Sequence, residues 1–146
     1  MKILFICRGN VGRSQIAEAI FRQLTNEKYL AQSAGTEAMG SDGKDLDGML
    51  LKDRGSSKYV IESLKEIGID VSNNFIKRLN LEMVENADKI IVIVKPETLP
   101  DFLKGNKKIT YWNIVDPDEQ TLEFHRQTRD EINKLVEEFI DSNLDS

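Results

Sequence analysis

The sequence has few of the residues that build disulfides and metal sites. Its 146 residues include one cysteine, Cys7, and one histidine, His125. A single cysteine excludes a disulfide within the chain, and a single histidine excludes a metal site made of several histidines. Because a reactive free thiol persists best in a reducing compartment, we expect the protein to work in the cytoplasm.

Long apolar runs, internal repeats and low-complexity tracts are missing as well. No run is long enough to span a membrane and the first residues lack the pattern of a secretory signal, so we expect no membrane association. The formal net charge of −5 argues against nonspecific nucleic-acid binding. An apolar content of 40% predicts one sizeable core, and hence a single domain over residues 1–146 that we expect to be a monomer.

Apolar patterning along the chain alternates between strand and helix periods. Short β-branched runs predict strands at 2–6, 29–33, 89–94 and 109–112. Apolar residues at helical spacing predict helices at 14–26, 57–67, 81–86, 97–103 and 119–141. This alternation predicts an α/β fold, a doubly wound parallel sheet with right-handed crossovers.

Residues 37–56 stand apart from this pattern, because glycine, serine and aspartate punctuate them. We predict a long irregular loop there, of the kind that often binds ligands. In its middle, Met49, Leu50 and Leu51 could close over a substrate or pack into the core as a short turn. The packed turn is favoured, since apolar residues usually lie inside.

The most informative segment is residues 2–14, which place Cys7 between an apolar strand and a glycine-bearing loop. Gly9, Asn10 and Gly12 tolerate the unusual backbone angles of a loop that aims successive N–H groups at one anion. Within such a ring of donors, we expect Cys7 to react as a thiolate. The segment therefore predicts a site that binds and attacks a tetrahedral oxyanion.

The next helix is expected to begin near Arg13 or Ser14 and to add its free N–H groups to the site. Arg13 can hold two oxyanion oxygens at once, more tightly as charge builds up on them. The Ser14 hydroxyl can donate to the sulfur and ease its departure. The alternative is that Cys7 is an ordinary buried thiol at the end of a strand.

The order Cys, five residues, Arg, Ser over Cys7–Ser14 resembles the phosphate loop of the low-molecular-weight protein tyrosine phosphatase family. The resemblance runs nearly end to end, with further matches at Ser33–Thr36, Gly68–Ser72, Asn86–Val92 and Val115–Pro117. It implies a four-stranded parallel sheet of strand order 2-1-3-4, with the phosphate loop after the first strand.

The resemblance implies a cysteine-dependent phosphomonoesterase, a protein tyrosine phosphatase that acts through a phosphocysteine intermediate. Cys7 would be the nucleophile and Arg13 the phosphate clamp. Asp116 would protonate the leaving oxygen and then activate water. No metal or cofactor is implied; the substrate would be a phosphotyrosine protein or a small phosphate ester, and phosphate-like oxyanions would inhibit.

The remaining residues of the loop would surround the substrate. They are Arg8, Gly9, Asn10, Val11, Gly12 and Ser14. Asn10, Ser14 and Ser33 would support the loop, and the resemblance implies a hydrogen bond between Asn10 and Ser33.

Several positions depart from the family pattern. Gly12 stands where a second cysteine often protects the nucleophile, and Gln15 replaces a proline, which a first helical turn should tolerate. Asp118 and Glu119 replace an aromatic pair that often follows Asp-Pro, so a stacking surface is lost and anions are repelled. We expect Arg8 at the mouth of the pocket, where it would offset Asp118 and steer anions.

Two other functions remain open at this point. One is an arsenate reductase that uses an external small thiol, since arsenate has the shape and charge of phosphate. The other is a non-catalytic oxyanion-binding module. Among the remaining residues, Tyr111 and Trp112 are predicted to lie in the core, and His125 is predicted to face solvent or cap a helix.

Overall fold

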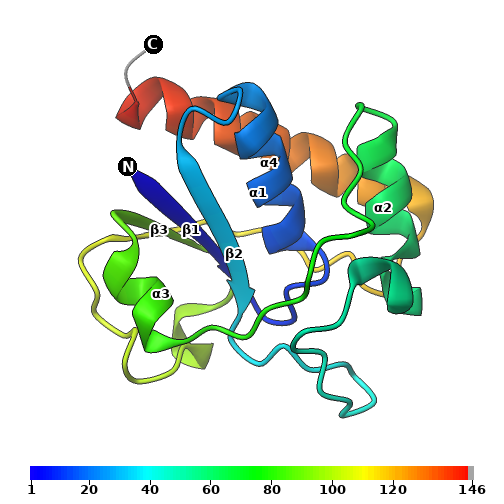
Figure 1. Cartoon of the computed structure of the whole chain (residues 1–146), viewed down its shortest axis with the longest axis horizontal. Helices are drawn as coiled ribbons and strands as arrows, with labels where there is room; N and C mark the ends of the chain where they lie inside the picture. The colour runs from blue at the N-terminus through cyan, green and yellow to red at the C-terminus, as the bar shows by residue number, and fades with distance from the viewer. Residues whose placement is uncertain (145–146) are drawn as a thin grey trace.

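The computed structural model describes residues 1–144, which form a four-stranded parallel sheet flanked by helices (Figure 1). The strands are β1 (Lys2–Cys7), β2 (Leu30–Gly35), β3 (Lys89–Val92) and β4 (Ile109–Tyr111). The α-helices are α1 (Arg13–Leu24), α2 (Lys58–Lys65), α3 (Leu81–Asn86) and α4 (Leu122–Asn143). The strand order is β2-β1-β3-β4 with every pairing parallel, which confirms the predicted fold class.

The central strand β1 sends alternate side chains into two separate cores. Ile3 and Phe5 pack with residues of α1 and α4, whereas Leu4 and Ile6 pack with residues of α3. Figure 1 shows α1 and α4 together on one face of the sheet and α3 on the other. Because neighbouring side chains of a strand point to opposite faces, a strand covered on both faces is apolar throughout. No helix within residues 1–144 is both long and apolar enough to cross a membrane.

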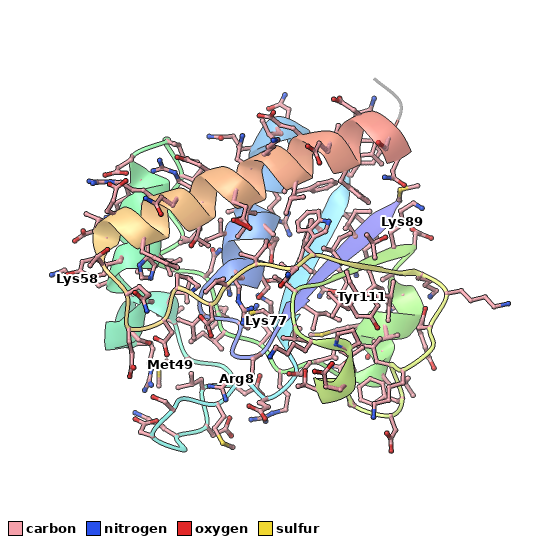
Figure 2. The ribbon with its side chains drawn as sticks, turned by 180° about the vertical axis from the view of Figure 1, so that it is seen from behind. Arg8, Met49, Lys58, Lys77, Lys89 and Tyr111 are labelled. Atoms are coloured by element: carbon pink, nitrogen blue, oxygen red, sulfur yellow. The ribbon has the colours of Figure 1, made fainter. Side chains whose placement is uncertain are left out.

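All four strands end at the same edge of the sheet. Figure 2 shows Arg8 and Met49 at this end of the molecule and Lys89, the first residue of β3, at the other. In open parallel sheets, ligands bind outside the carboxyl ends of the strands. The loop after β1 therefore lies where a site is expected.

Two predicted helices differ from those observed. Over 97–103 the chain forms only a short 3-10 helix, Pro96–Thr98, followed by turns. Pro100 explains this, because it forces the preceding Leu99 into an extended conformation with φ −70° and ψ 145°. The last helix begins at Leu122 rather than at residue 119. Thr121 caps this start, because its hydroxyl accepts a hydrogen bond from the backbone N–H of Phe124 in the first turn.

The middle of the segment 37–56 packs into the core as a short turn, which is the alternative that its apolar residues favour. Leu51 is fully buried at the start of a 3-10 helix, and Leu46 is buried beside it in the same core. Trp112 is also a core residue, with its ring centroid 6.1 Å from that of Phe5. The core prediction is wrong for Tyr111, which is 45% exposed because β4 is an edge strand whose face is incompletely covered.

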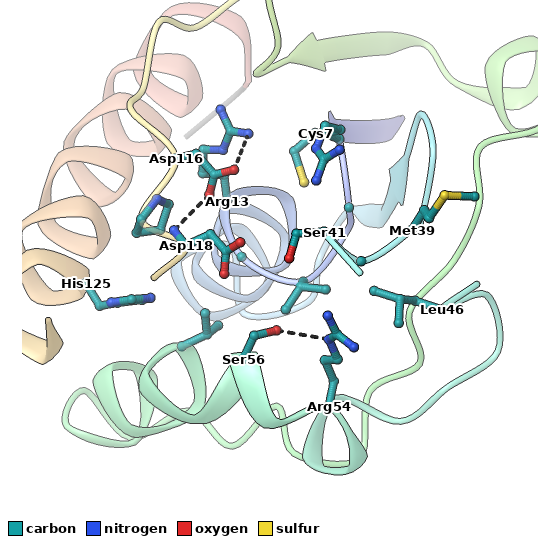
Figure 3. A pocket seen from close by; sticks show the side chains of 17 residues that line it. Cys7, Arg13, Met39, Ser41, Leu46, Arg54, Ser56, Asp116, Asp118 and His125 are labelled. Carbon is teal, nitrogen blue, oxygen red and sulfur yellow. Dashed lines mark hydrogen bonds and ion pairs between the residues drawn. The ribbon is translucent and has the colours of Figure 1, made fainter. Parts of the chain in front are cut away.

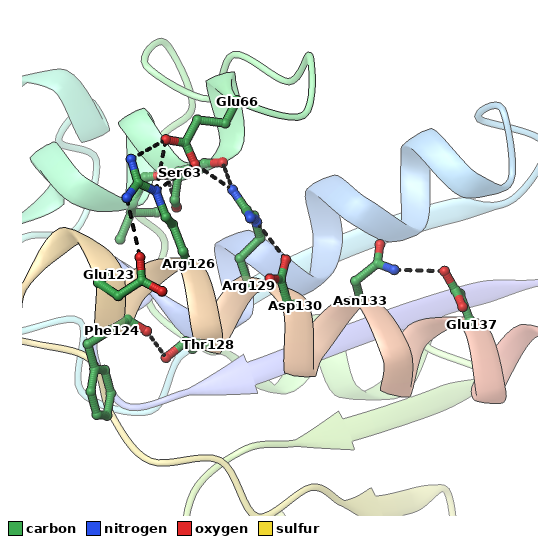
Figure 4. A network of polar contacts seen from close by, with 11 residues as sticks. Ser63, Glu66, Glu123, Phe124, Arg126, Thr128, Arg129, Asp130, Asn133 and Glu137 are labelled. Carbon is green, nitrogen blue, oxygen red and sulfur yellow. Dashed lines mark hydrogen bonds and ion pairs between the residues drawn. The ribbon is translucent and has the colours of Figure 1, made fainter.

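A network of ion pairs ties the start of α4 to the end of α2 (Figure 4). The Glu66 carboxylate accepts hydrogen bonds from Arg126 and Arg129, each at 2.7 Å. Arg129 also donates to the backbone carbonyl of Ser63 at 2.8 Å. These guanidinium groups, Arg126 first, hold the pKa of Glu66 below its ordinary value. The network fixes the helix that follows the Asp116 loop.

Candidate active site

Cys7 ends β1 at the base of a loop that turns back over it. Its sulfur lies 2.8 Å from Ser14 Oγ and accepts a hydrogen bond from the backbone N–H of Asn10 at 3.3 Å. The residue is 2% exposed, and α1 begins at Arg13, directly after the loop, so the first N–H groups of the helix have no partner in a preceding turn. The thiol, the Ser14 hydroxyl and the Asn10 N–H thus lie together at the start of the loop.

Asn10 holds this loop in shape from inside. It is fully buried and its backbone adopts a left-handed conformation, with φ 59°. Its Nδ2 donates to Ser14 Oγ at 2.8 Å, and its Oδ1 accepts from Gln15 Nε2 at 3.0 Å and from the backbone N–H of Lys77 at 2.8 Å. The sequence analysis did not predict that Gln15 and Lys77 hold Asn10, because no local sequence pattern indicates these contacts.

The hydrogen bond that the resemblance implies between Asn10 and Ser33 is not formed. Ser33 Oγ is buried and has no hydrogen-bond partner within the described residues. The Asn10 amide is already engaged by Ser14, Gln15 and Lys77. Those three contacts replace the implied one.

Gly35, the last residue of β2, lies directly beneath the loop. A Cβ atom there would stand 2.7 Å from the Arg8 carbonyl oxygen and 2.8 Å from the Gly9 carbonyl carbon. Real Cβ contacts are not so short, so any side chain would push the loop outward. The closeness of β2 to the loop therefore requires glycine at this position.

Arg13 reaches from the first turn of α1 to the ends of two strands. Its Nη1 donates to the carbonyls of Ile93, at 2.8 Å, and Ile114, at 3.0 Å. Its Nη2 lies 3.5 Å from Asp116 Oδ2, and the side chain is 11% exposed. The two carbonyls orient the guanidinium and leave its other N–H groups for a ligand.

Asp116 follows β4 and stands at the rim of the pocket beside Arg13 (Figure 3). Its side chain is 50% exposed, and its Oδ1 accepts a hydrogen bond from the backbone N–H of Asp118 at 3.0 Å. The Asp118 N–H therefore holds one carboxylate oxygen and Arg13 lies beside the other, while the side chain stays exposed enough for solvent and a ligand to reach it. The fold brings Asp116 into one pocket with Cys7, although more than a hundred residues separate them in the chain.

Arg8 lines the pocket at its outer edge, but its partner differs from the expected one. Its Nη1 donates to Glu37 Oε2 at 2.8 Å, and among the described residues it forms no hydrogen bond or ion pair with Asp118. Both side chains of the pair are about half exposed. The carboxylate that Arg8 offsets comes from the segment 37–56, whose path the sequence pattern does not predict.

His125 does not face solvent, so the solvent-facing part of its prediction is wrong. The residue is 2% exposed and lines the pocket, with its ring edge against Tyr59 at a centroid separation of 5.6 Å. Its Nδ1 lies 2.8 Å from the carbonyl of Thr121. A carbonyl only accepts, so Nδ1 carries the hydrogen and Nε2 is left as the second ring nitrogen, without a partner among the described residues.

The segment 37–56 supplies one whole wall of the pocket. Met39, Leu46, Arg54 and Ser56 lie on this wall, across from Arg13 and Asp116 in Figure 3. No Phe, Tyr or Trp is among the described residues that line the pocket. Within residues 1–144, no three His, Cys, Asp or Glu side chains gather closely enough to hold a metal ion.

A parallel sheet with a Cys, five-residue, Arg loop between its first strand and first helix defines a class of oxyanion-binding proteins. The chain belongs to the low molecular weight phosphotyrosine protein phosphatase family, whose model matches residues 2–145. Both the resemblance read from the sequence and the strand order it implies are confirmed.

Similar proteins carry more than one name. Arsenate reductase 1 of Staphylococcus haemolyticus is 30% identical over 139 residues, which are 94% of this chain and 92% of the relative. A low molecular weight protein tyrosine phosphatase of T. tengcongensis is 26% identical, with a TM-score of 0.76 and coverage of 97% of this chain and 99% of the other. The YwlE arginine phosphatase of Geobacillus stearothermophilus shares the fold at 24% identity, with a TM-score of 0.78 and coverage of 97% and 91%.

Proposed function

We propose that the protein is a cysteine-dependent phosphomonoesterase of the protein tyrosine phosphatase type. One observation carries the proposal: the Cys7 sulfur lies within 2.8 Å of Ser14 Oγ, in one pocket with a carbonyl-anchored Arg13 and the half-exposed carboxyl of Asp116. Binding an anion needs a basic group and N–H donors, but it needs neither a thiol nor an acid. Their presence together favours catalysis over a pure binding role.

The chemistry takes two steps. The Cys7 thiolate attacks phosphorus in line, and a sulfur–phosphorus bond forms as the ester oxygen–phosphorus bond breaks. Asp116 gives its proton to the leaving oxygen, while Arg13 and the loop N–H groups hold the other phosphoryl oxygens. Water then attacks phosphorus, Asp116 takes its proton, and the sulfur leaves as a thiolate eased by the Ser14 hydroxyl. Phosphate is released and the enzyme is restored without a cofactor.

The substrate class is an aryl phosphate such as phosphotyrosine, or a small phosphate ester. Family membership favours phosphotyrosine. The pocket wall offers it aliphatic contacts from Met39, Leu46 and Val60 in place of an aromatic stack. Inorganic phosphate and arsenate should compete with the substrate, since the same donors would hold them.

The test is hydrolysis of an aryl phosphate across pH, without added metal, by the wild type and matched variants. Cys7→Ser should abolish turnover while phosphate still binds, because the donors of the loop remain. Asp116→Ala should lower turnover by about 10²- to 10⁴-fold, the usual contribution of a general acid. Asp118→Asn removes a carboxylate from the same loop and should keep turnover. A wild type that binds phosphate but hydrolyses no ester would overturn the proposal.

A second candidate is an arsenate reductase that depends on an external thiol, which the name of the Staphylococcus haemolyticus relative favours. Cys7 would displace water from arsenate and form a sulfur–arsenic bond. An external thiol would then attack the Cys7 sulfur, arsenic would leave as arsenite with the electron pair, and a second thiol would reduce the mixed disulfide. The chain has one cysteine, so both thiols must come from outside. Arsenite formation that requires added small thiol, with no ester hydrolysis, would favour this candidate.

A further inference from the structure

Arg54 is a third arginine of the pocket, and the two-step chemistry does not use it. It follows a short 3-10 helix of the segment 37–56, and its side chain is 17% exposed on the wall across from Arg13. Figure 3 shows its guanidinium turned toward the pocket, beside Leu46 and below Ser41. Its position places a fixed positive charge away from the phosphoryl site.

The guanidinium is held in place by its surroundings. Its Nε donates to Ser56 Oγ at 3.2 Å and its Nη1 to Asp42 Oδ2 at 3.4 Å. Its Nη2 lies against the backbone of Gly40, where an added Cβ would overlap it. Glycine at position 40 thus leaves the space that Arg54 occupies.

Only part of the donor capacity of Arg54 is used. Of five N–H groups, one is given to Ser56 and one to Asp42. Asp42 is 58% exposed, and its contact of 3.4 Å is long for a charge-assisted hydrogen bond. A carboxylate arriving from the pocket could meet the remaining N–H groups or take the place of Asp42.

We propose that Arg54 binds a carboxylate on the leaving group of the substrate, and so selects phosphomonoesters that carry a second acidic group. The proposal rests on the phosphomonoesterase function and names its substrate class. Arg13 and the loop hold the phosphoryl group, which leaves Arg54 to the other end of the ligand. Asp118 stands on the opposite wall and repels an anion there, so the second charge is directed toward Arg54.

The test is binding of two unreactive probes that differ in one charge. The first is a para-phosphonomethyl phenylpropanoate and the second is its primary amide; calorimetry compares them with inorganic phosphate. The wild type should bind the carboxylate about tenfold more tightly than the amide, the factor expected of one charge-assisted pair. In Arg54→Gln the two probes should bind within about twofold of each other, while affinity for inorganic phosphate is unchanged.

Two further variants separate a local contact from a general effect of charge. Gly40→Ala keeps Arg54 but displaces its guanidinium, and should lose the preference as well. Lys52→Gln removes one exposed positive charge from the same segment outside the pocket, and should keep it. Equal affinity of the wild type for both probes, or a preference that survives Arg54→Gln, would overturn the proposal. The binding of these probes does not require turnover. A protein that hydrolyses no ester but still prefers the carboxylate probe through Arg54 would therefore contradict the phosphatase function and not the role of Arg54.

Discussion

Replacing Asn10 by alanine should be among the most damaging changes to the phosphate loop. The Asn10 amide makes three hydrogen bonds, to Ser14, Gln15 and the backbone of Lys77, and each contributes about 1 kcal/mol net. Its left-handed backbone, with φ 59°, costs alanine roughly 1 kcal/mol more than asparagine. The expected loss in the free energy of unfolding is therefore about 4 kcal/mol.

Ser33→Ala provides the matched control. Its hydroxyl is buried without a partner among the described residues, so removing it breaks no hydrogen bond and ends the cost of desolvating that group. The free energy of unfolding should fall by no more than about 0.5 kcal/mol, or it should increase. If the loop depended on an Asn10–Ser33 bond instead, both substitutions would be costly.

Urea and thermal denaturation of the wild type and both variants measure the difference in stability, and titration calorimetry measures their binding of inorganic phosphate. At about 2–4 °C per kcal/mol for a chain of this size, Asn10→Ala should lower Tm by roughly 8–16 °C. Phosphate affinity should fall with it, since the N–H groups of the loop lose their alignment. Equal losses in Asn10→Ala and Ser33→Ala would refute the reasoning.

Two further predictions concern charges around the site. Arg8→Ala should lower kcat/KM by about 3- to 10-fold with little change in kcat, because an exposed charge attracts the anionic substrate and takes no part in the chemical step. High salt should shrink the difference between wild type and variant, and an unchanged kcat/KM would contradict this role. Arg126 and Arg129 hold the pKa of Glu66 below its ordinary value of 4.5. The Glu66 carboxylate therefore stabilises the folded state above pH 4.5, and this stabilisation is lost as the pH falls through the lowered pKa. Denaturation of wild type and Glu66→Gln should therefore differ at pH 7 and converge in strong acid, and a difference that persists there would count against the ion pairs.

Local patterns in the sequence were enough to predict the segment that carries the nucleophile. Strand, loop and helix follow one another over residues 2–24, so the contact of Cys7 with Ser14 depends only on short-range geometry. Short-range rules also gave the boundaries of α3 correctly. They failed at 97–103, where the restriction that Pro100 places on Leu99 outweighed helical spacing.

Contacts between distant segments could not be read from periodicity. The resemblance suggested that Asp116 joins Cys7, but the pairing of Arg8 with Glu37 and the burial of His125 depend on how loops pack above the sheet. Apolar spacing records which residues lie inside, and it carries no information on which polar side chains meet.

By itself, then, the sequence determined the α/β class, the oxyanion loop from Cys7 to Ser14 and, through its resemblance, the strand order. The tertiary structure alone decided that Lys77 rather than Ser33 secures Asn10, and that Arg54 stands in the wall of the pocket. The physical reason is that a strand, a nest or a helix start is specified by neighbouring residues. The position of a side chain on a long connecting segment is instead set by the packing of the whole chain.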